Sequence, residues 1–252
     1  MNKLRLLDIG SANPRLEEGW NKLNNVEIVM FEPDERSYDD LIKNKQDNSY
    51  LVFNYALSSK DETKKLYLTK KPECTSLYKP NMKYHNKFPN SQRWEIIKTI
   101  NVGCKSLKTI YKEVGEYDFI KIDTQGSELD ILEGAIGGGM ETTLGIESEV
   151  EFLELYEKQP LFGDMCKFMI DNGFEFYDFV VEYRYGRREL NRKGQLAFAD
   201  ALFLRTPEWI CDNYLNKTIN EDKVWKYIQI CKVYGKIDLI EVVGENINFK
   251  IE

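Results

Sequence analysis

The feature that most constrains the fold is an apolar run near the N-terminus that stops at an acid and a glycine. Residues 4–9 read LRLLDI, and Gly10, Ser11, Ala12 and Asn13 follow directly. A short, nearly continuous apolar run is typical of a strand buried on both faces of a parallel sheet. A glycine after such a strand permits a tight turn and a close approach of the backbone to a ligand. The run therefore predicts an α/β sheet whose first strand ends at a binding loop.

The same unit recurs along the chain, where strand-like runs alternate with helix-like stretches. The expected strands cover 4–9, 26–31, 50–53 and 118–122, with another opening at 143–147, and the expected helices cover about 15–24, 34–44, 105–114, 126–135 and 162–172. Two later runs, near 174–183 and 196–204, are typical of an antiparallel pair. This alternation predicts a doubly wound sheet with helices on both faces. Ligands of such sheets bind beyond the carboxyl ends of the strands, where the strand order reverses. We expect that point between the first strand and 118–122.

A polar segment interrupts this alternation between residues 71 and 94. Added strands are expected on either side of it, at 60–69 and 95–102. The segment holds three prolines and four aromatic residues, namely Pro72, Pro80, Pro89, Tyr78, Tyr84, Phe88 and Trp94. A connection of this length inside a compact domain is usually functional or disordered. We therefore interpret 71–94 as a candidate substrate lid whose aromatic side chains could stack on a sugar ring.

The residues from Pro207 onward form a separate pattern. A helical pattern runs over about 208–234, and a short apolar tail follows at 237–251. We interpret 1–206 as the main domain and 207–252 as a C-terminal helical extension. A chain of 252 residues is long enough for one sizeable α/β domain with such an accessory piece.

Charge and cysteine content narrow the expected partners and compartment. The formal net charge of −7 argues against nucleic acid, because binding to a polyphosphate needs a concentrated basic surface. The dense basic run at 183–188, with Arg192 and Lys193, fits either a solvated hairpin tip or a clamp for a phosphate or acidic group. The five cysteines form no CxxC pair, which fits a reducing compartment. Neither a membrane-length apolar run nor a signal-peptide core is present, so we expect a cytoplasmic protein.

Polar residues close two successive strands in a way that indicates a nucleoside ligand. Asp8 and Gly10 end the first strand, and Glu32 followed by Pro33 ends the second. An acid at the second position can accept hydrogen bonds from both hydroxyls of a ribose. The combination indicates a ligand that contains adenosine, without separating NAD from S-adenosylmethionine. The full GxGxxG spacing of a dinucleotide loop is absent, which counts against NAD.

The next two strand ends also offer polar groups. Asn54 and Ala56 follow the third strand, where the edge of an adenine would fall. Asp123 follows the fourth strand, where a reacting centre would fall. The alternative for Asp123 is that it only caps the helix that starts near Gly126.

Alternating carboxylates follow the opening of the fifth strand. Glu147, Glu149 and Glu151 project to one face if the strand runs that far. A row of carboxylates in a parallel sheet is costly unless it is paired, bound to a cation or lining a wet cleft. We favour the cleft. The alternative is that the strand stops at Glu147 and that the other two cover a polar loop.

His85 is the only histidine of the chain, and it lies in the 71–94 segment. A lone histidine in a loop is most often a solvated surface residue. The alternative is a general base that a closing lid delivers to the reaction site.

Together, these segments resemble the FkbM family of S-adenosylmethionine-dependent methyltransferases. The similarity covers most of 4–205 and is carried by LLDIGSANP (6–14), FEP (31–33), NYALSS (54–59), TSLYKPN (75–81), FIKIDTQGSELDILEGA (119–135), IESEVEFLELYEKQPLF (146–162) and GQLAFADALFLR (194–205). The IDTQGSE block and the Glu-rich run after it are the most specific segments. The first motif departs from the family pattern, because Ser11 stands where alanine is common and Pro14 follows Asn13.

The resemblance implies a class I methyltransferase (Rossmann-like) fold, an α/β fold with a seven-stranded, mostly parallel sheet and an antiparallel last strand. It also implies O-methylation of a hydroxyl, often on a sugar or on a carbohydrate-containing natural product. The residues implied to bind S-adenosylmethionine are Asp8, Gly10 and Asn13 with Ser11 and Ala12 on the methionine side, Glu32 with Pro33 at the ribose, Asn54 and Ala56 beside the adenine, and Asp123 facing the transferring methyl.

Methyl transfer to a sugar hydroxyl needs a base or a cation, because the hydroxyl is a weak nucleophile. We expect Asp123, with Glu149 or His85, to supply this help. Whether Asp123, Glu147 and Glu149 also hold a divalent metal ion is left open by the sequence.

Other functions compete with this one. The acceptor could be a small molecule other than a sugar, or the chain could bind S-adenosylmethionine without catalysis. A nucleic-acid methyltransferase is disfavoured by the acidic charge and by the lack of an Asn/Asp-Pro-Pro-aromatic motif. An NAD-dependent oxidoreductase is disfavoured by the missing GxGxxG. The oligomeric state is open, and a homo-oligomer is one option.

Overall fold

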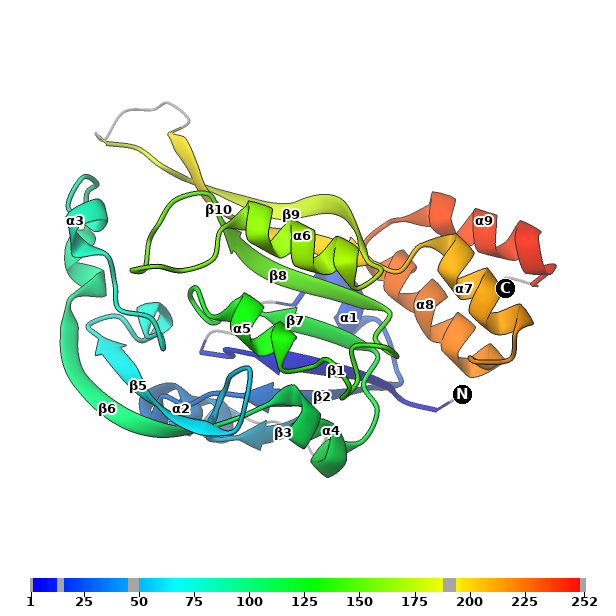
Figure 1. Cartoon of the computed structure of the whole chain (residues 1–252), viewed down its shortest axis with the longest axis horizontal. Coiled ribbons are helices and arrows are strands. Elements are labelled where there is room, and N and C mark those ends of the chain that lie inside the picture. The colour runs from blue at the N-terminus through cyan, green and yellow to red at the C-terminus, as the bar shows by residue number, and fades with distance from the viewer. Residues whose placement is uncertain (1, 13–15, 45–49, 188–193, 250–252) are drawn as a thin grey trace.

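The computed structural model describes residues 2–12, 16–44, 50–187 and 194–249. Its main layer is a seven-stranded sheet with the order β3-β2-β1-β7-β8-β10-β9 (Figure 1). The strands are β1 (Leu4–Ile9), β2 (Val26–Phe31), β3 (Tyr50–Phe53), β7 (Phe119–Ile122), β8 (Gly145–Glu151), β9 (Glu175–Tyr185) and β10 (Gln195–Leu204). Neighbours pair in parallel except where β10 pairs with β8 and β9. The expected seven-stranded, mostly parallel sheet with an antiparallel last strand is confirmed, and its order reverses between β1 and β7 as predicted.

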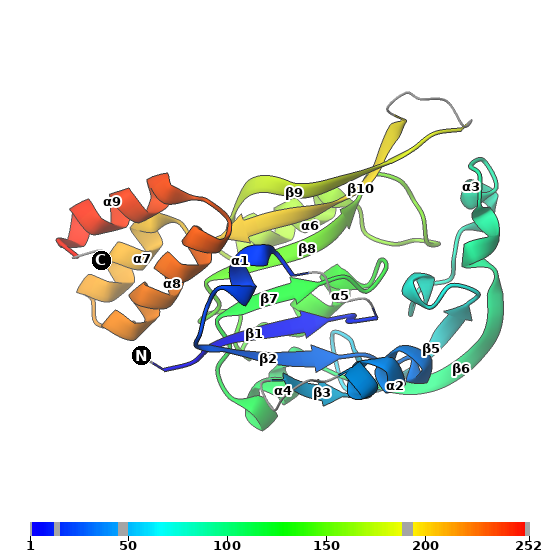
Figure 2. The same cartoon turned by 180° about the vertical axis from the view of Figure 1, so that it is seen from behind.

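Helices cover both faces of this sheet (Figures 1 and 2). They are α1 (Glu18–Asn21), α2 (Glu35–Asn44), α4 (Leu107–Val114), α5 (Glu128–Glu133), α6 (Phe162–Asp171), α7 (Pro207–Leu215), α8 (Glu221–Val233) and α9 (Ile237–Ile247). One apolar cluster joins α4, α5 and α6 to Leu7 and Ile9 of β1. A second cluster joins α1, α7, α8 and α9 to Leu4 and Leu6 of the same strand. The side chains divide in this way because successive strand residues point to opposite faces.

The C-terminal helices belong to the core rather than standing apart from it. Ile228 of α8 and Ile240 of α9 are buried in the same cluster as Phe119 of β7. Most of the short apolar tail expected at 237–251 forms helix α9. Its buried residues recur at helical spacing: Leu239, Ile240 and Val243. The helical run expected over about 208–234 is two helices, α7 and α8.

A second, smaller sheet stands beyond the carboxyl ends of the main strands (Figure 2). Its order is β4-β6-β5, with β4 (Ala56–Leu57), β5 (Glu62–Thr69) and β6 (Ile96–Lys105), so the added strands expected on either side of the 71–94 segment are confirmed. The segment itself contains the short helices η1 (Pro72–Cys74), α3 (Met82–His85) and η2 (Ser91–Trp94). It is anchored by Tyr156, whose hydroxyl donates to the Cys74 carbonyl oxygen at 3.1 Å.

Three boundaries bear on the site. Asp34 caps α2, because its Oδ1 accepts a hydrogen bond from the Arg36 backbone N–H at 3.0 Å. The helix expected over about 15–24 is shorter, since α1 covers only Glu18–Asn21. Strand β8 continues through Glu151. Among the helices of the described residues, none is long and apolar enough to cross a bilayer.

Candidate functional site

A cavity opens at the carboxyl ends of the strands, where the strand order reverses. Its empty space is about 1400 Å³, with the open mouth included. It brings together most of the residues predicted from the sequence: Asp8, Gly10, Ala12, Glu32, Pro33, Ala56, Asp123 and Glu149. Three predicted residues do not line it: Ser11, Asn54 and His85. Asn13 lies outside the described residues.

The loop after β1 brings its backbone and one carboxylate to the cavity. Gly10 has a φ of +85°, and a Cβ there would collide with the Asp123 carbonyl oxygen, so this position requires glycine. Asp8 is 2% exposed, and its Oδ2 has no hydrogen-bond partner in the described part of the chain. Burial raises the pKa of Asp8, while Lys121 opposes that rise. Ser11 is turned inward, since its hydroxyl donates to the Asp8 carbonyl oxygen at 2.8 Å.

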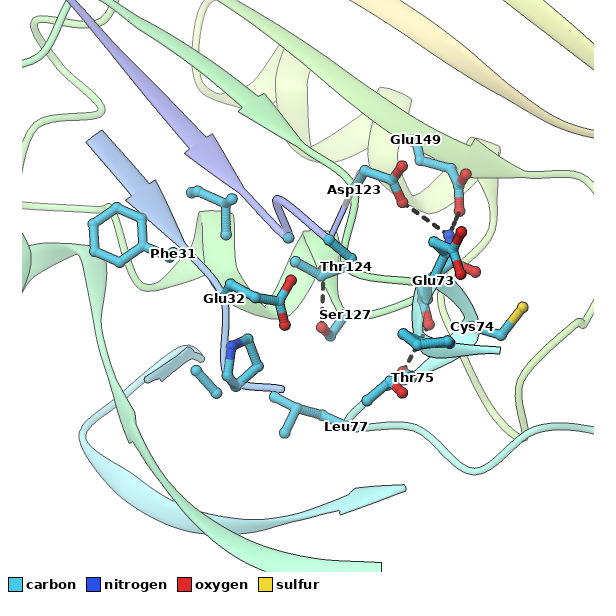
Figure 3. A pocket seen from close by; sticks show the side chains of 18 of the residues that line it. Phe31, Glu32, Glu73, Cys74, Thr75, Leu77, Asp123, Thr124, Ser127 and Glu149 are labelled. Carbon is cyan, nitrogen blue, oxygen red and sulfur yellow. Dashed lines mark hydrogen bonds between the residues drawn. The ribbon is translucent and has the colours of Figure 1, made fainter. Parts of the chain in front are cut away.

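Glu32 closes β2 with a side chain that points into the cavity (Figure 3). It is 4% exposed, and its Oε1 accepts a hydrogen bond from the Asp34 backbone N–H at 2.8 Å. Burial raises the pKa of Glu32 to about 8, because the carboxylate loses its hydration. A ligand that donates hydrogen bonds to Glu32 would stabilise the ionised form.

The two residues expected beside an adenine behave differently. Ala56 is buried at the start of β4 and lines the cavity. Asn54 is exposed, and its Nδ2 donates to the Glu32 carbonyl oxygen at 3.0 Å. Asn54 therefore braces the loop that carries Glu32, and this position does not favour the direct ligand contact that we expected.

Asp123 and Glu149 point toward one another in the cavity (Figure 3). The side-chain amide of Gln125 bridges them, since its Nε2 donates to Asp123 Oδ1 and to Glu149 Oε1, both at 2.8 Å. Gln125 Oε1 lies 2.9 Å from the Tyr156 hydroxyl and shares its single proton with the Cys74 carbonyl oxygen, which favours this orientation of the amide. Gln125 has a φ of 61°, a conformation uncommon outside glycine and often found at functional sites.

Glu128, rather than Asp123, holds the start of α5. Its Oε1 accepts a hydrogen bond from the Thr124 backbone N–H at 2.6 Å, and its Oε2 accepts one from Gly126 at 2.9 Å. The alternative that Asp123 serves only as a helix cap is therefore wrong. Burial raises the pKa of Glu128 to about 7.

Three carboxyl groups are close enough to hold a metal ion. One oxygen from each of Asp123, Glu128 and Glu149 lies within 4.8 Å of the others. This set differs from the trio considered from the sequence, because Glu128 stands in place of Glu147. The Gln125 amide already bridges two of the three groups, and backbone N–H groups bind the third. Hydrogen bonds thus hold this cluster together.

The alternating carboxylates of β8 are all buried on one face, at 3% to 5% exposure. The alternative that the strand stops at Glu147 is therefore wrong. Burial raises the pKa of Glu147 to about 7, and it raises the pKa values of Glu149 and Glu151 well above their ordinary value. Of the three, Glu149 lines the cavity. Glu147 instead accepts a hydrogen bond at 2.6 Å from the hydroxyl of Tyr234, the residue that follows α8.

Lys121 is a site residue that the sequence interpretation missed. It stands beside Asp8 and Glu147 in the register of the sheet, is 7% exposed and lines the cavity. Burial lowers the pKa of Lys121, but the carboxylates of Asp123, Asp8, Glu147 and Asp200 outweigh burial and raise it above its ordinary value. The sequence does indicate this role, since Lys121 lies inside the apolar strand run FIKI. A lysine buried in such a strand needs carboxylate partners.

The part of the cavity near β9 and β10 has aromatic walls. Trp94 comes from η2, Tyr183 and Tyr185 from β9, and Phe198 from β10. The sequence interpretation included Trp94 and missed the other three, because pairing of β9 with β10 brings them to the site. Three other aromatic residues of the 71–94 segment, expected to face a sugar, do not line the cavity: Tyr78, Tyr84 and Phe88.

His85 is not a surface residue, so that expectation is wrong. It is 1% exposed and stacks on Trp94 with 3.9 Å between ring centroids. Burial lowers the pKa of His85 to about 4. Because His85 packs behind Trp94 and does not line the cavity, its position does not favour the role of general base.

The basic run near the β9–β10 hairpin is only partly visible, since 188–193 lie outside the described residues. Arg184 is exposed, and its Nη2 lies 2.8 Å from Glu182. This pair fits the solvated hairpin tip better than the clamp for an acidic group.

Comparison with known proteins identifies the domain that carries these residues. A family model described as the methyltransferase FkbM domain matches residues 8–176, which is more than half of the chain. The chain belongs to the FkbM methyltransferase family. The FkbM domain thus includes Asp8, Glu32, Asp123 and Glu149, and the resemblance drawn from the sequence is confirmed. A search of curated protein sequences finds no match.

Solved methyltransferase structures are similar to the chain at low sequence identity. The FkbM methyltransferase from Methylobacillus flagellatus KT has 12% identity and a TM-score of 0.45, over 80% of this chain and 43% of that one. Precorrin-6y C5,15-methyltransferase from Geobacter metallireducens GS-15 has 11% identity and a TM-score of 0.44, over 82% of each chain. Magnesium protoporphyrin IX methyltransferase from Synechocystis PCC 6803, with bound S-adenosylmethionine, has 10% identity and a TM-score of 0.43, over 81% and 71%. These likenesses are too distant to assign an acceptor to this FkbM domain.

Proposed function

We propose that this FkbM domain transfers a methyl group from S-adenosylmethionine to a hydroxyl group of a sugar, a glycan or a glycosylated natural product. The observation that carries the proposal is the position of Asp123. It follows β7 in the middle of the sheet, between a part of the cavity lined by Asp8 and Glu32 and a part lined by aromatic residues. A base between a cofactor site and an acceptor site is the arrangement that methyl transfer to a hydroxyl requires.

The residues at the ends of β1 and β2 fit S-adenosylmethionine. Asp8 Oδ2 is buried without a partner among the residues described, and a ligand ammonium group would supply one. Glu32 would accept hydrogen bonds from ribose hydroxyls, and Gly10 lets the backbone approach the ligand. The small Ala56 leaves room for an adenine, and Leu57 offers it an apolar surface. When bound, S-adenosylmethionine supplies an electrophilic methyl group on a sulfonium.

Asp123 is the base in this proposal. The Gln125 amide holds its carboxylate in place, and the buried Lys121 ammonium places a positive charge near it. Burial raises the pKa of Glu149 well above its ordinary value and so favours its protonated form, and in this proposal Glu149 positions the acceptor hydroxyl rather than acting as a second base. His85 has no direct part in the reaction.

The aromatic walls support a sugar as the acceptor. Tyr183 and Phe198 stack with 4.4 Å between centroids, and Trp94 lies in the same part of the cavity. Such rings offer flat apolar faces with few polar groups, which suits the C–H face of a sugar. The same walls would accept a different small molecule, so a non-sugar acceptor is the second candidate. With a net charge of −7, the chain is not proposed to act on nucleic acid.

Labelled methyl transfer tests the proposal. The full chain is incubated with methyl-labelled S-adenosylmethionine and a panel of nucleotide sugars, oligosaccharides and lipid-linked glycans, and products are separated and counted. We expect label in at least one carbohydrate. Because hydrogen bonds already hold the carboxylate cluster, transfer should persist after treatment with EDTA. Loss of transfer with EDTA, and its return with a divalent ion, would contradict this metal-free account.

Calorimetry separates the competing functions. The chain should bind S-adenosylhomocysteine and not NAD. Binding of S-adenosylhomocysteine without transfer to any member of the panel would favour the non-catalytic alternative. Binding of NAD alone would overturn the cofactor assignment.

A further inference from the structure

The cavity is wide enough across the sheet to hold two ligands side by side. It reaches from Glu32 at the end of β2 to Phe198 on β10. Those strands are four spacings apart in the strand order, which is roughly 19 Å at the usual spacing of strands. The side near β2 is the proposed cofactor site. The side near β10 is therefore the acceptor side, and its charges indicate which acceptor it takes.

Three cationic side chains line the cavity in the described part of the chain: Lys71, Arg93 and Lys121. Lys71 is paired with Glu73 at 3.4 Å. Lys121 is surrounded by carboxylates, as described above. Arg93 forms no ion pair with any carboxylate of the described residues. It is therefore the cation of this cavity that can receive an anion.

Arg93 is held in an aromatic setting with donor groups left over. Its guanidinium carbon lies 3.8 Å from the centroid of Trp94 and 5.8 Å from that of Tyr185. Its Nη2 donates to the Tyr185 hydroxyl at 3.0 Å. Its Nε is buried and has no hydrogen-bond partner in the described ranges. A buried donor without a partner costs free energy that a bound acceptor group would recover.

The guanidinium is suited to a planar or tetrahedral oxyanion. Its donors form a rigid fork that binds carboxylate or phosphate through two parallel hydrogen bonds. The stacking on Trp94 fixes the plane of that fork. The Glu149 carboxyl group lines the same cavity, and burial raises its pKa well above the ordinary value, which favours its neutral form beside a bound anion.

We propose that Arg93 binds an anionic group of the methyl acceptor, so that the acceptor is a sugar with a carboxylate or a phosphate. This inference rests on the proposed function, because it names the acceptor class of the same site. The aromatic walls then pack on the sugar ring while Arg93 holds the charged substituent. The substituent orients the ring, and one hydroxyl is presented to Asp123.

The test compares three probes on the full chain saturated with S-adenosylhomocysteine. Glucuronate carries a carboxylate, glucose 6-phosphate carries a phosphate, and glucose carries neither. Titration calorimetry should give an affinity for at least one charged probe that exceeds that for glucose by roughly tenfold, the value of a charge-assisted hydrogen bond. The charged probe that binds more tightly distinguishes the two acceptor classes. Equal affinity for all three, or no binding of any, would overturn the inference.

Three variants locate the effect. Arg93→Gln should bind the charged probes no better than glucose. Arg184→Gln removes the same charge from the exposed hairpin, outside the cavity lining, and should keep the wild-type preference. Arg93→Lys keeps the charge without the fork and should keep part of the preference, which provides a second reading if Arg93→Gln lowers the melting temperature. A preference that survives in Arg93→Gln would contradict the inference.

The outcome also separates this inference from the function on which it rests. Methyl transfer to neutral sugars, with no gain for charged ones, would remove the role of Arg93 and leave the methyltransferase proposal standing. Failure to bind S-adenosylhomocysteine at all would remove the proposed function itself.

Discussion

Asp123 shows what a single residue contributes at the centre of this cavity. Its Oδ1 accepts the Gln125 amide at 2.8 Å, and its carbonyl oxygen would collide with any Cβ at Gly10. The same residue thus fixes the cofactor loop through its backbone and faces the acceptor through its side chain. Its place at a strand end made it predictable from sequence.

The first prediction concerns the Asp123 side chain. Asp123→Asn keeps the shape and removes the base, so turnover should fall by roughly 10²- to 10⁴-fold. Affinity for S-adenosylhomocysteine should stay within about tenfold, because the carboxylate acts on the acceptor. Asp171→Asn, at an exposed site, is the matched control. Unchanged turnover in Asp123→Asn would exclude it as the base.

The second prediction concerns Glu32 and the pH dependence of cofactor binding. Since burial raises the pKa of Glu32 to about 8, the free protein holds this proton near neutral pH. Ribose hydroxyls favour the ionised form, so binding should release a proton. Affinity for S-adenosylhomocysteine should then rise as pH increases from about 6 to 7.5, by at most tenfold per pH unit for one proton.

Calorimetry in two buffers with different ionisation enthalpies counts the released proton. Glu32→Gln should flatten the pH dependence, whereas Glu133→Gln, exposed on α5, should preserve it. A pH-independent affinity in the wild-type protein would show that Glu32 does not meet the ribose.

Some site residues can be identified from the sequence and others cannot, because their roles depend on contacts between residues that are distant in the chain. Asp8, Glu32 and Asp123 could be placed from sequence because each directly follows or closes a buried strand. Gln125 and Arg93 could not, because their roles depend on side-chain contacts with Tyr156 and Tyr185, which are distant in sequence. His85 was misjudged for the same reason, since the stacking on Trp94 that buries it cannot be read from a polar loop.

At the scale of elements, strands were easier to predict than the tail and the long connection. Strand β8 was read correctly through its alternation, and β5 and β6 were recognised on either side of the 71–94 segment. The segment itself is ordered by contacts with other elements, such as the Tyr156–Cys74 hydrogen bond. The tail was recognised as apolar, and its buried residues recur at helical spacing in α9.

The third prediction concerns α7, α8 and α9 as part of the fold. A chain ending at Arg205 would expose the buried side chains that these helices cover on β1, β7 and β10. It would also strip Asp118, 1% exposed, of its ion pairs with Lys223 and Lys226 at 2.8 and 3.0 Å. We expect this chain to aggregate or to lose its cooperative melting transition in circular dichroism.

A pair of point variants controls for the size of the deletion. Ile228→Ser places a hydroxyl in the core at a fully buried site and should destabilise the protein by about 3 kcal/mol or more. Leu215→Ser, at a site that is 63% exposed, should have little effect. A truncated chain that stays monomeric and melts cooperatively would show that the helices are an independent appendage.

The whole molecule concentrates buried carboxyl groups at one end of its sheet. Burial raises the pKa of Glu32 to about 8 and the pKa values of Glu128 and Glu147 to about 7. Such a concentration is costly for stability and typical of a functional site. Three features offset this loss of stability: the positive charge of Lys121, the hydrogen bonds to the carboxyl groups, and the protons that some of these groups retain.

The fourth prediction follows from those protons. Above about pH 6.5 the unfolded chain has lost these protons, whereas the folded chain gives up those of Glu128 and Glu147 only as pH rises through about 7, and that of Glu32 through about 8. The folded state therefore binds more protons, and the free energy of unfolding falls as pH rises, by at most about 1.4 kcal/mol per pH unit for each retained proton. His85 does not contribute here, because its pKa is lowered to about 4 and it is neutral in both states above its ordinary value of 6.5.

Thermal melting of the ligand-free protein at several pH values measures this effect. The midpoint should decrease from pH 6.5 to 8, and Glu147→Gln should decrease less steeply. A midpoint that increases over this range would mean that these carboxyl groups are ionised in the folded protein.

The most direct test of the whole account is the bond that the transferred methyl group forms. The full chain is incubated with ¹³C-methyl S-adenosylmethionine and the acceptor that gains label in the panel, and the product is examined by NMR spectroscopy. We expect a ¹³C-methyl group attached to oxygen on a sugar ring, and no such product with Asp123→Asn. A methyl group attached to nitrogen or carbon, or the same product formed at full rate by Asp123→Asn, would contradict it.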